Sequence, residues 1–74
     1  MRVTVKLFAT FRDGRFKEKE FELPAEATVK ELLGQIRLTP DQVAILLVNG
    51  RNGRPDQELQ DGDILSLFPP VGGG

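Results

Sequence analysis

The chain has 74 residues, with 10 lysines and arginines against 11 aspartates and glutamates, a formal net charge of −1, and neither cysteine nor histidine. This length predicts one domain near the lower size limit for a core without covalent or metal support. The missing residue types remove disulfides, a thiol nucleophile, the usual general base and the commonest metal ligands, so composition disfavours an enzyme, a bound cofactor and a metal site. The balanced charge disfavours nucleic acid and anionic membranes, and no segment has the pattern of a membrane span or signal peptide. We therefore expect a cytoplasmic location.

The first segment, residues 1–11, alternates apolar and polar side chains and predicts a strand with one buried face. Its apolar positions are odd: Val3, Val5, Leu7, Ala9 and Phe11. Phe8 falls on the polar side: either it is exposed for docking a partner, or it fills a second small core or the strand twists. Asp13-Gly14 is typical of a turn between antiparallel strands, which predicts a hairpin with residues 16–23.

The second predicted strand carries Glu18, Glu20 and Glu22 on one face and Lys17, Lys19, Phe21 and Leu23 on the other. Paired carboxylates are candidates for acid–base chemistry, but that chemistry needs a cleft that separates their pKa values. An alternating ladder of this kind is more typical of a solvated edge strand that resists aggregation, and we favour that interpretation.

A helix is predicted to begin at Thr28, which forms a capping-box pattern with Glu31, and to end before Thr39 because Pro40 follows. Its apolar stripe consists of Val29, Leu32, Leu33 and Ile36. Gly34 inside the helix should cost about 1 kcal/mol relative to alanine, unless a closely approaching strand needs the space.

Residues 44–48 form a continuous apolar run, which predicts a strand buried on both faces in the middle of a sheet. Asn49-Gly50 and Asn52-Gly53 favour hairpin-type turns over a phosphate-binding nest, and Asp61-Gly62-Asp63 favours a turn over a calcium loop. Residues 64–68 predict the last strand, which Pro69 ends because proline cannot donate to the ladder.

This order of elements predicts an α+β fold of the β-grasp class. We expect a mixed sheet of about four to five strands, with one main helix on one face and the first and last strands paired at its centre. The domain should span residues 1–68, and residues 69–74 should form an extended C-terminal tail.

The tail, Pro69-Pro70-Val71-Gly72-Gly73-Gly74, follows the last strand directly. The prolines favour an extended course, and residues 69–74 in that form could carry the terminal carboxylate about 20 Å from the domain. Since glycine adds no side-chain chemistry, the α-carboxylate of Gly74 is the candidate reactive group.

Three segments resemble the MoaD/ThiS family of ubiquitin-like sulfur carriers, and MoaD in particular. They are Val5 to Arg12 (VKLFATFR), Leu47 to Gly50 (LVNG), and Leu59 to Asp63 (LQDGD) with Leu67 to Val71 (LFPPV) and the terminal diglycine. Gly72 departs from MoaD by completing a triple glycine, which is similar to ThiS.

The resemblance implies a non-enzymatic carrier for molybdopterin synthesis. A MoeB- or ThiF-like adenylyltransferase would use MgATP to activate Gly74, and a persulfide would supply sulfur for a thiocarboxylate. A MoaE-like large subunit would accept the tail through Gly72 and Gly73 and would bind Phe8, Phe68, Pro69, Pro70 and Val71. Alternatives are a ThiS-like carrier for thiazole synthesis, carriers for tungsten-cofactor or cysteine pathways, and a protein modifier that forms isopeptide bonds through Gly74.

Overall fold

The computed structural model describes residues 1–70, so the predictions for Val71, Gly72, Gly73 and Gly74 lie outside the described residues. The elements in chain order are β1 (Arg2–Leu7), the 3-10 helix η1 (Ala9–Arg12), β2 (Glu18–Glu22), α1 (Val29–Gln35), the 3-10 helix η2 (Pro40–Gln42), β3 (Ile45–Val48), β4 (Arg51–Asn52) and β5 (Ile64–Phe68).

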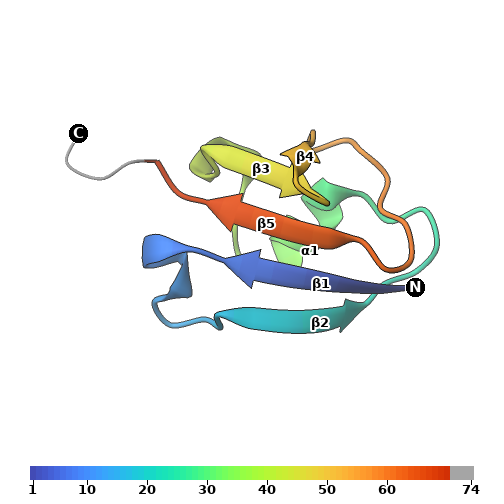
Figure 1. The fold of residues 1–74 in the computed structure, drawn as a ribbon, viewed down its shortest axis with the longest axis horizontal. Coiled ribbons are helices and arrows are strands. Elements are labelled where there is room, and N and C mark those ends of the chain that lie inside the picture. The colour runs from blue at the N-terminus through green and yellow to red at the C-terminus, as the bar shows by residue number, and fades with distance from the viewer. Residues whose placement is uncertain (71–74) are drawn as a thin grey trace.

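The strands form one mixed sheet in the order β2-β1-β5-β3-β4 (Figure 1). β1 is parallel to β5 and antiparallel to β2, whereas β3 is antiparallel to both of its neighbours. The first and last strands therefore pair at the centre, as predicted, and α1 packs against one face of the sheet. The predicted β-grasp fold is confirmed.

The core lies between this face of the sheet, called the inner face below, and α1. The central strands contribute fully buried side chains at alternate positions: Val3, Val5 and Leu7 from β1, and Leu65 and Leu67 from β5. The helix contributes Val29, Leu32 and Leu33, and the last residue of the predicted stripe, Ile36, is buried at the C-cap just after the helix. Each such side chain stabilises the fold by about 1.5–3 kcal/mol, so the two matching periodicities hold the helix on the sheet.

The predicted capping box begins α1. The Thr28 hydroxyl accepts a hydrogen bond from the Glu31 N–H at 3.3 Å, and the Glu31 carboxylate accepts one from the Thr28 N–H at 3.2 Å. Gly34 needs no space for a neighbour, because a Cβ placed there would meet nothing within 4 Å. Its helix-propensity penalty is therefore not compensated by close packing.

The C-terminal end of α1 is a Schellman motif with an unusual residue in the left-handed position. The Leu38 N–H donates to the Leu33 carbonyl at 2.9 Å, and the Arg37 N–H donates to the Gly34 carbonyl at 3.2 Å. Arg37 has φ 63°, where glycine is the usual choice. The helix thus ends at Gln35, well before Pro40.

The first strand was predicted too long. β1 ends at Leu7, because Ala9 has φ 52° and the chain turns into η1. Phe11 is buried all the same, since η1 folds it back to the core, whereas Ala9 is exposed. The second strand is also shorter than predicted and begins at Glu18.

The prediction that residues 44–48 are buried on both faces was wrong. Ile45 is 49% exposed, and only Val48 in this run is buried. The single helix covers one face of the sheet, and β4 beside β3 has only two residues. The outward side chains of β3 therefore remain accessible.

The predicted turns at Asn49-Gly50 and Asp61-Gly62 are confirmed, whereas Asn52-Gly53 forms no hairpin turn, because Asn52 belongs to β4 and the Gly53 N–H continues the pairing with β3. Asn49 and Gly50 both have positive φ (54° and 80°) and connect Val48 to Arg51, as a two-residue hairpin of the I′ kind requires. The Asp63 carboxylate accepts hydrogen bonds from the Gln60 N–H and from the Asn49 side-chain amide, so it closes the turn of residues 60–63.

Gly53 lies close beside β3. Its N–H donates to the Leu46 carbonyl at 2.9 Å, and a Cβ there would lie 2.7 Å from the Leu46 side chain and 2.8 Å from that of Val48. No larger residue fits without displacing these core side chains.

Candidate functional site: the tail exit and the outer face

The last strand is held on both sides up to the point where the tail begins. On one side the Phe8 N–H donates to the Leu67 carbonyl at 3.2 Å, and on the other the Ala44 N–H donates to the Phe68 carbonyl at 2.9 Å. Pro69 has no N–H, so it ends the ladder there. The sheet therefore fixes the point from which the tail leaves.

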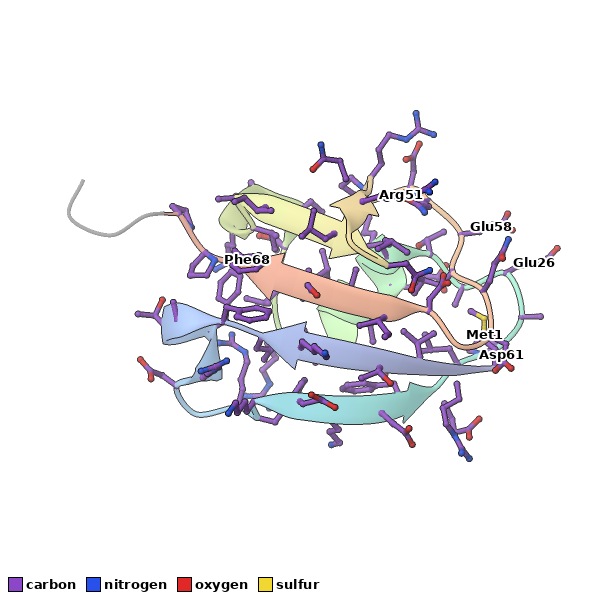
Figure 2. The ribbon with its side chains drawn as sticks, viewed as in Figure 1. Met1, Glu26, Arg51, Glu58, Asp61 and Phe68 are labelled. Atoms are coloured by element: carbon purple, nitrogen blue, oxygen red, sulfur yellow. The ribbon has the colours of Figure 1, made fainter. Side chains whose placement is uncertain are left out.

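Phe8 and Phe68 form a stacked pair beside this exit. Their ring centroids are 4.2 Å apart and their planes differ by 9°. Both side chains are half-buried, and Phe8 is not among the residues packed against the main core. Figure 2 shows Phe68 at the tail end of the molecule, with Met1, Glu26, Glu58 and Asp61 at the opposite end. Phe8 therefore lies on the outer face of the sheet, half-buried against Phe68, and its role in docking a partner stays a prediction.

Arg12 fixes Phe8 from the side of η1. Its guanidinium carbon lies 5.3 Å from the centroid of the Phe8 ring, and its Nε donates to the Leu7 carbonyl at 2.7 Å. A cation near an aromatic ring adds about 0.5–1 kcal/mol at an exposed site. The ring orientation is thus set by η1 as well as by β5.

The face of the sheet away from α1 carries further apolar side chains, which we call the outer-face patch together with the stacked pair. Its members are Phe8, Ile45, Leu47, Ile64 and Phe68. Ile45 pairs in register with Phe68, and Ile64 is 39% exposed. Pro69 is half-buried and Pro70 is exposed at the end of the patch. Rigid, accessible apolar side chains grouped in this way are typical of a protein interaction surface.

The sequence did not reveal Ile45, Leu47 and Ile64 as patch members. Two signals were available: one helix can cover only one face of a sheet, and the Asn49-Gly50 turn leaves room for only a short strand before Gly53. Together these signals predict that alternate positions of the apolar run face away from the helix, and the register with β5 shows that they are Ile45 and Leu47.

The carboxylates of β2 form no reactive pair. Glu18, Glu20 and Glu22 are all exposed, and Arg2 contacts Glu20 at 3.9 Å and Glu22 at 3.0 Å. The hydrogen bond to Glu22 and the charges of Glu22 and Glu20 raise the pKa of Arg2 above its ordinary value, so it stays charged. The interpretation of this strand as a solvated edge is confirmed.

Among residues 1–70 no three acidic side chains lie close enough to hold a metal ion. No helix in the same range is long and apolar enough to cross a membrane.

The fold defines the class of this protein: a ubiquitin-like β-grasp domain with the C-terminal segment leaving from its central strand. A family model described as the ThiS family matches residues 5–74. The chain therefore belongs to the ThiS family, the ubiquitin-like sulfur carriers that its sequence resembles.

Solved structures agree with this assignment. A Pyrococcus furiosus protein assigned to subunit 1 of the molybdopterin converting factor is 38% identical, with a TM-score of 0.79 over 96% of this chain and 99% of that one. SAMP1 from Haloferax volcanii is 27% identical, with a TM-score of 0.78 over 100% of both chains. A complex of subunits 1 and 2 of the molybdopterin converting factor from Helicobacter pylori contains a chain of the same fold, at 22% identity and a TM-score of 0.63 over 100% of both chains.

Proposed function

We propose that this protein is a sulfur carrier whose Gly74 carboxylate is converted to a thiocarboxylate and donates sulfur in molybdopterin synthesis. The observation that carries the proposal is the tail exit, where β5 is bonded on both sides and then continues into Pro69-Pro70 and the terminal glycines. Family membership and the identity to the Pyrococcus protein support it. The same support favours a non-enzymatic subunit, with catalysis on its partners.

The chemistry requires activation, because a carboxylate is a poor acyl donor. A Gly74 carboxylate oxygen attacks the α-phosphorus of MgATP in a MoeB- or ThiF-like adenylyltransferase, pyrophosphate leaves and an acyl-adenylate forms. The terminal sulfur of a donor persulfide then attacks the carbonyl carbon and AMP leaves, giving an acyl disulfide. A second donor thiol cleaves this disulfide, so the donor is oxidised to its own disulfide and the thiocarboxylate remains on Gly74.

The carrier contributes placement to these steps. Each attacking atom must come within about 3–3.5 Å of the terminal carbonyl, in two different partner proteins. Gly72 and Gly73 have no side chains to obstruct either channel. In our proposal the outer-face patch, with Pro69, Pro70 and Val71, docks on the adenylyltransferase or on a MoaE-like large subunit while the tail enters.

The proposal is tested by mass spectrometry. We expect the intact protein, incubated with its adenylyltransferase, ATP and a persulfide donor, to gain the mass of one sulfur in exchange for one oxygen. The Gly74-deleted protein is the matched control and should gain nothing. If the intact chain never shows this exchange, the carrier function is wrong.

The acceptor is tested separately with the thiocarboxylate form. Loss of sulfur to a MoaE-like subunit in the presence of a pterin precursor supports the molybdopterin pathway. Loss only to a thiazole-forming enzyme supports the ThiS-like alternative, which Gly72 favours by completing the triple glycine.

A second candidate function is protein modification through Gly74, and the similarity to SAMP1 favours it. The Gly74 carbonyl would then form isopeptide bonds with lysines of other proteins. Lysates should contain higher-mass adducts that disappear when Gly74 is deleted. Their absence under several growth conditions would count against this function.

A further inference from the structure

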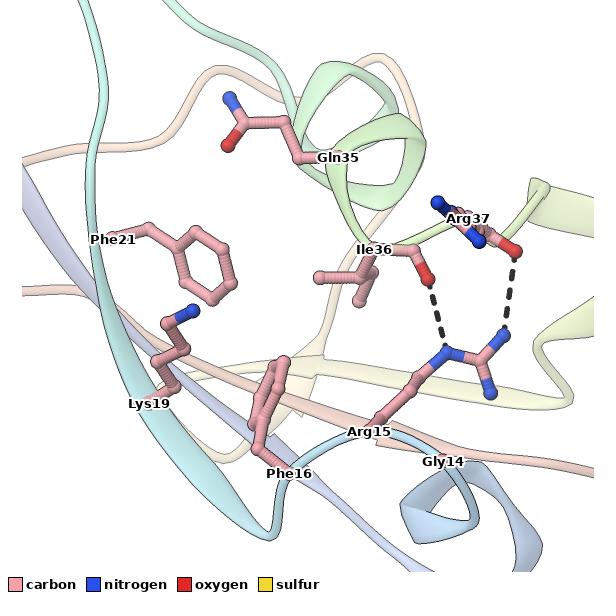
Figure 3. A pocket seen from close by; sticks show the side chains of 8 residues that line it. All are labelled: Gly14, Arg15, Phe16, Lys19, Phe21, Gln35, Ile36 and Arg37. Carbon is pink, nitrogen blue, oxygen red and sulfur yellow. Dashed lines mark hydrogen bonds between the residues drawn. The ribbon is translucent and has the colours of Figure 1, made fainter.

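A hollow lies on the helix side of the sheet. A cavity of about 340 Å³ opens between β2, the loop before it and the C-terminal end of α1. Figure 3 shows that the side chains of Phe16, Phe21 and Ile36 point into a common space. The two phenylalanine rings are 5.6 Å apart and both residues are half-buried. The volume is at the lower limit of ligand pockets, which suits one or two apolar side chains of a partner.

The rim of this cavity is positively charged. Lys19 Nζ lies 5.3 Å from the Phe21 centroid and 5.9 Å from the Phe16 centroid, and Arg37 lines the same cavity. In the range 1–70 the ion pairs involve only Arg2 and Arg54, so neither rim cation is paired there. The rim therefore lacks its own counter-charge.

Arg15 also lines this cavity, but it has a different role. Its guanidinium donates to the carbonyls of Ile36 at 3.0 Å and Arg37 at 3.4 Å, where the end of α1 exposes acceptors. This contact joins the loop before β2 to the helix and stabilises the helix end. The cavity thus has one rigid wall, and Lys19 and Arg37 are the cations left to bind a ligand.

The strand beside the cavity has a free edge. β2 is the outermost strand next to β1. The Leu7 N–H donates to the Lys17 carbonyl and the Leu23 N–H to the Met1 carbonyl, so odd residues of this segment direct their backbone groups towards β1. By alternation, Glu18, Glu20 and Glu22 direct theirs away from the sheet. Such an edge is a template for another strand.

Antiparallel pairing of two copies through this edge is disfavoured. The outward backbone groups belong to the even positions on both copies, so glutamates would lie opposite glutamates. Like charges directly opposite each other destabilise a strand pair. The edge therefore favours a strand with a different charge pattern.

We propose that the free edge of β2 and the adjoining cavity bind an extended acidic–apolar segment of a partner protein, which adds a strand to the sheet. On the inner face, a branched apolar side chain would fill the space between Phe16, Phe21 and Ile36, with carboxylates near Lys19 and Arg37. On the outer face, basic or polar side chains would lie beside the glutamates of β2. Backbone hydrogen bonds supply the affinity, and the two faces supply the specificity.

This site is independent of the proposed sulfur chemistry. It lies on the helix side of the sheet, whereas the outer-face patch and tail exit occupy the other face and the end of β5. A partner segment bound here leaves the tail free to enter a second protein. The carrier could thus stay tethered to one protein while its tail reacts in another.

The test uses two synthetic peptides of identical composition. The probe, Thr-Asp-Lys-Ile-Lys-Val-Thr-Asp, places its acidic and apolar residues on one face. The control, Thr-Lys-Asp-Ile-Asp-Val-Thr-Lys, exchanges the two charges. Both are titrated into the full isotope-labelled protein and followed by NMR, with amide hydrogen exchange measured at the highest concentration.

We expect the probe to shift the amide signals of β2 and of the end of α1. Amide exchange at Glu18, Glu20 and Glu22 should slow about tenfold at nine-tenths saturation, because only the free tenth of the protein then exchanges. The control peptide should bind more weakly. Equal binding of both peptides, or shifts confined to the outer-face patch, would overturn the proposal.

Charge reversal gives the second test. Lys19→Glu should weaken probe binding about three- to tenfold, because the exposed attraction between Lys19 and the probe's aspartates becomes a repulsion. The same change should strengthen binding of the control peptide, whose lysines would then face a glutamate. Lys30→Glu makes the same charge change on α1 outside the cavity and should alter neither affinity. If the two variants behave alike, or if the protein alone dimerises through β2, the proposed site is wrong.

Discussion

Replacing Arg37 by glycine should stabilise the fold, because Arg37 occupies a left-handed backbone conformation at the end of α1 (φ 63°). That conformation costs about 1–2 kcal/mol for a residue with a Cβ. Glycine removes this cost but loses about 0.5–1 kcal/mol through the greater freedom of the unfolded chain. The net gain is about 0.5–1 kcal/mol, which in a domain of this size raises the Tm by about 2–8 °C. Thermal unfolding followed by circular dichroism measures it.

Arg37→Ala is the matched control, since it removes the guanidinium and keeps the strained backbone. Its stability should remain close to that of the parent, so the difference between the two variants isolates the backbone contribution. If Arg37→Gly is no more stable than Arg37→Ala, the strain argument is refuted. Both variants should weaken binding of the probe peptide equally, because both remove the rim cation beside Ile36.

Four further predictions concern the exit, the packing and the tail. In a double-mutant cycle measured by urea unfolding, alanine at Phe8 and Phe68 should show a coupling of about 0.5–1.5 kcal/mol, and additive effects would mean that the stack contributes nothing. Gly53→Ala should destabilise by about 1–3 kcal/mol because its Cβ would overlap two side chains of β3. Gly34→Ala should instead stabilise by about 1 kcal/mol, and chemical denaturation that ranked the two substitutions in the opposite order would contradict the packing described here. Deleting Gly74 should abolish thiocarboxylate formation in the mass assay and leave the Tm unchanged; a lower Tm would show that the terminus also supports the fold.

Local sequence patterns predicted the first strand and the start of the helix, because interactions between residues close in the chain determine these elements. The alternation of Val3, Val5 and Leu7 and the capping box of Thr28 with Glu31 involve neighbours in the chain. Their outcome depends little on what packs elsewhere. The pairing of the first and last strands followed from the handedness of one crossover.

The site was harder to predict because it depends on contacts between distant segments. The sequence singles out Phe8 because it falls on the polar side of an alternating strand. Its stack on Phe68, however, depends on the register between β1 and β5. The exposure of Ile45 depends on the shortness of β4, which a run of apolar residues does not reveal. The cavity beside β2 combines a loop, a strand and a helix end, so no single motif predicts it.

The parallel pairing of β1 with β5 also governs when the molecule can fold during its synthesis. β5 lies at the centre of the sheet, so a chain that stops before Phe68 lacks the strand that joins β1 to β3. The sheet cannot close while this strand is still inside the ribosome, because its long-range pairs have no partner. Every folded copy therefore contains the strand from which the tail departs.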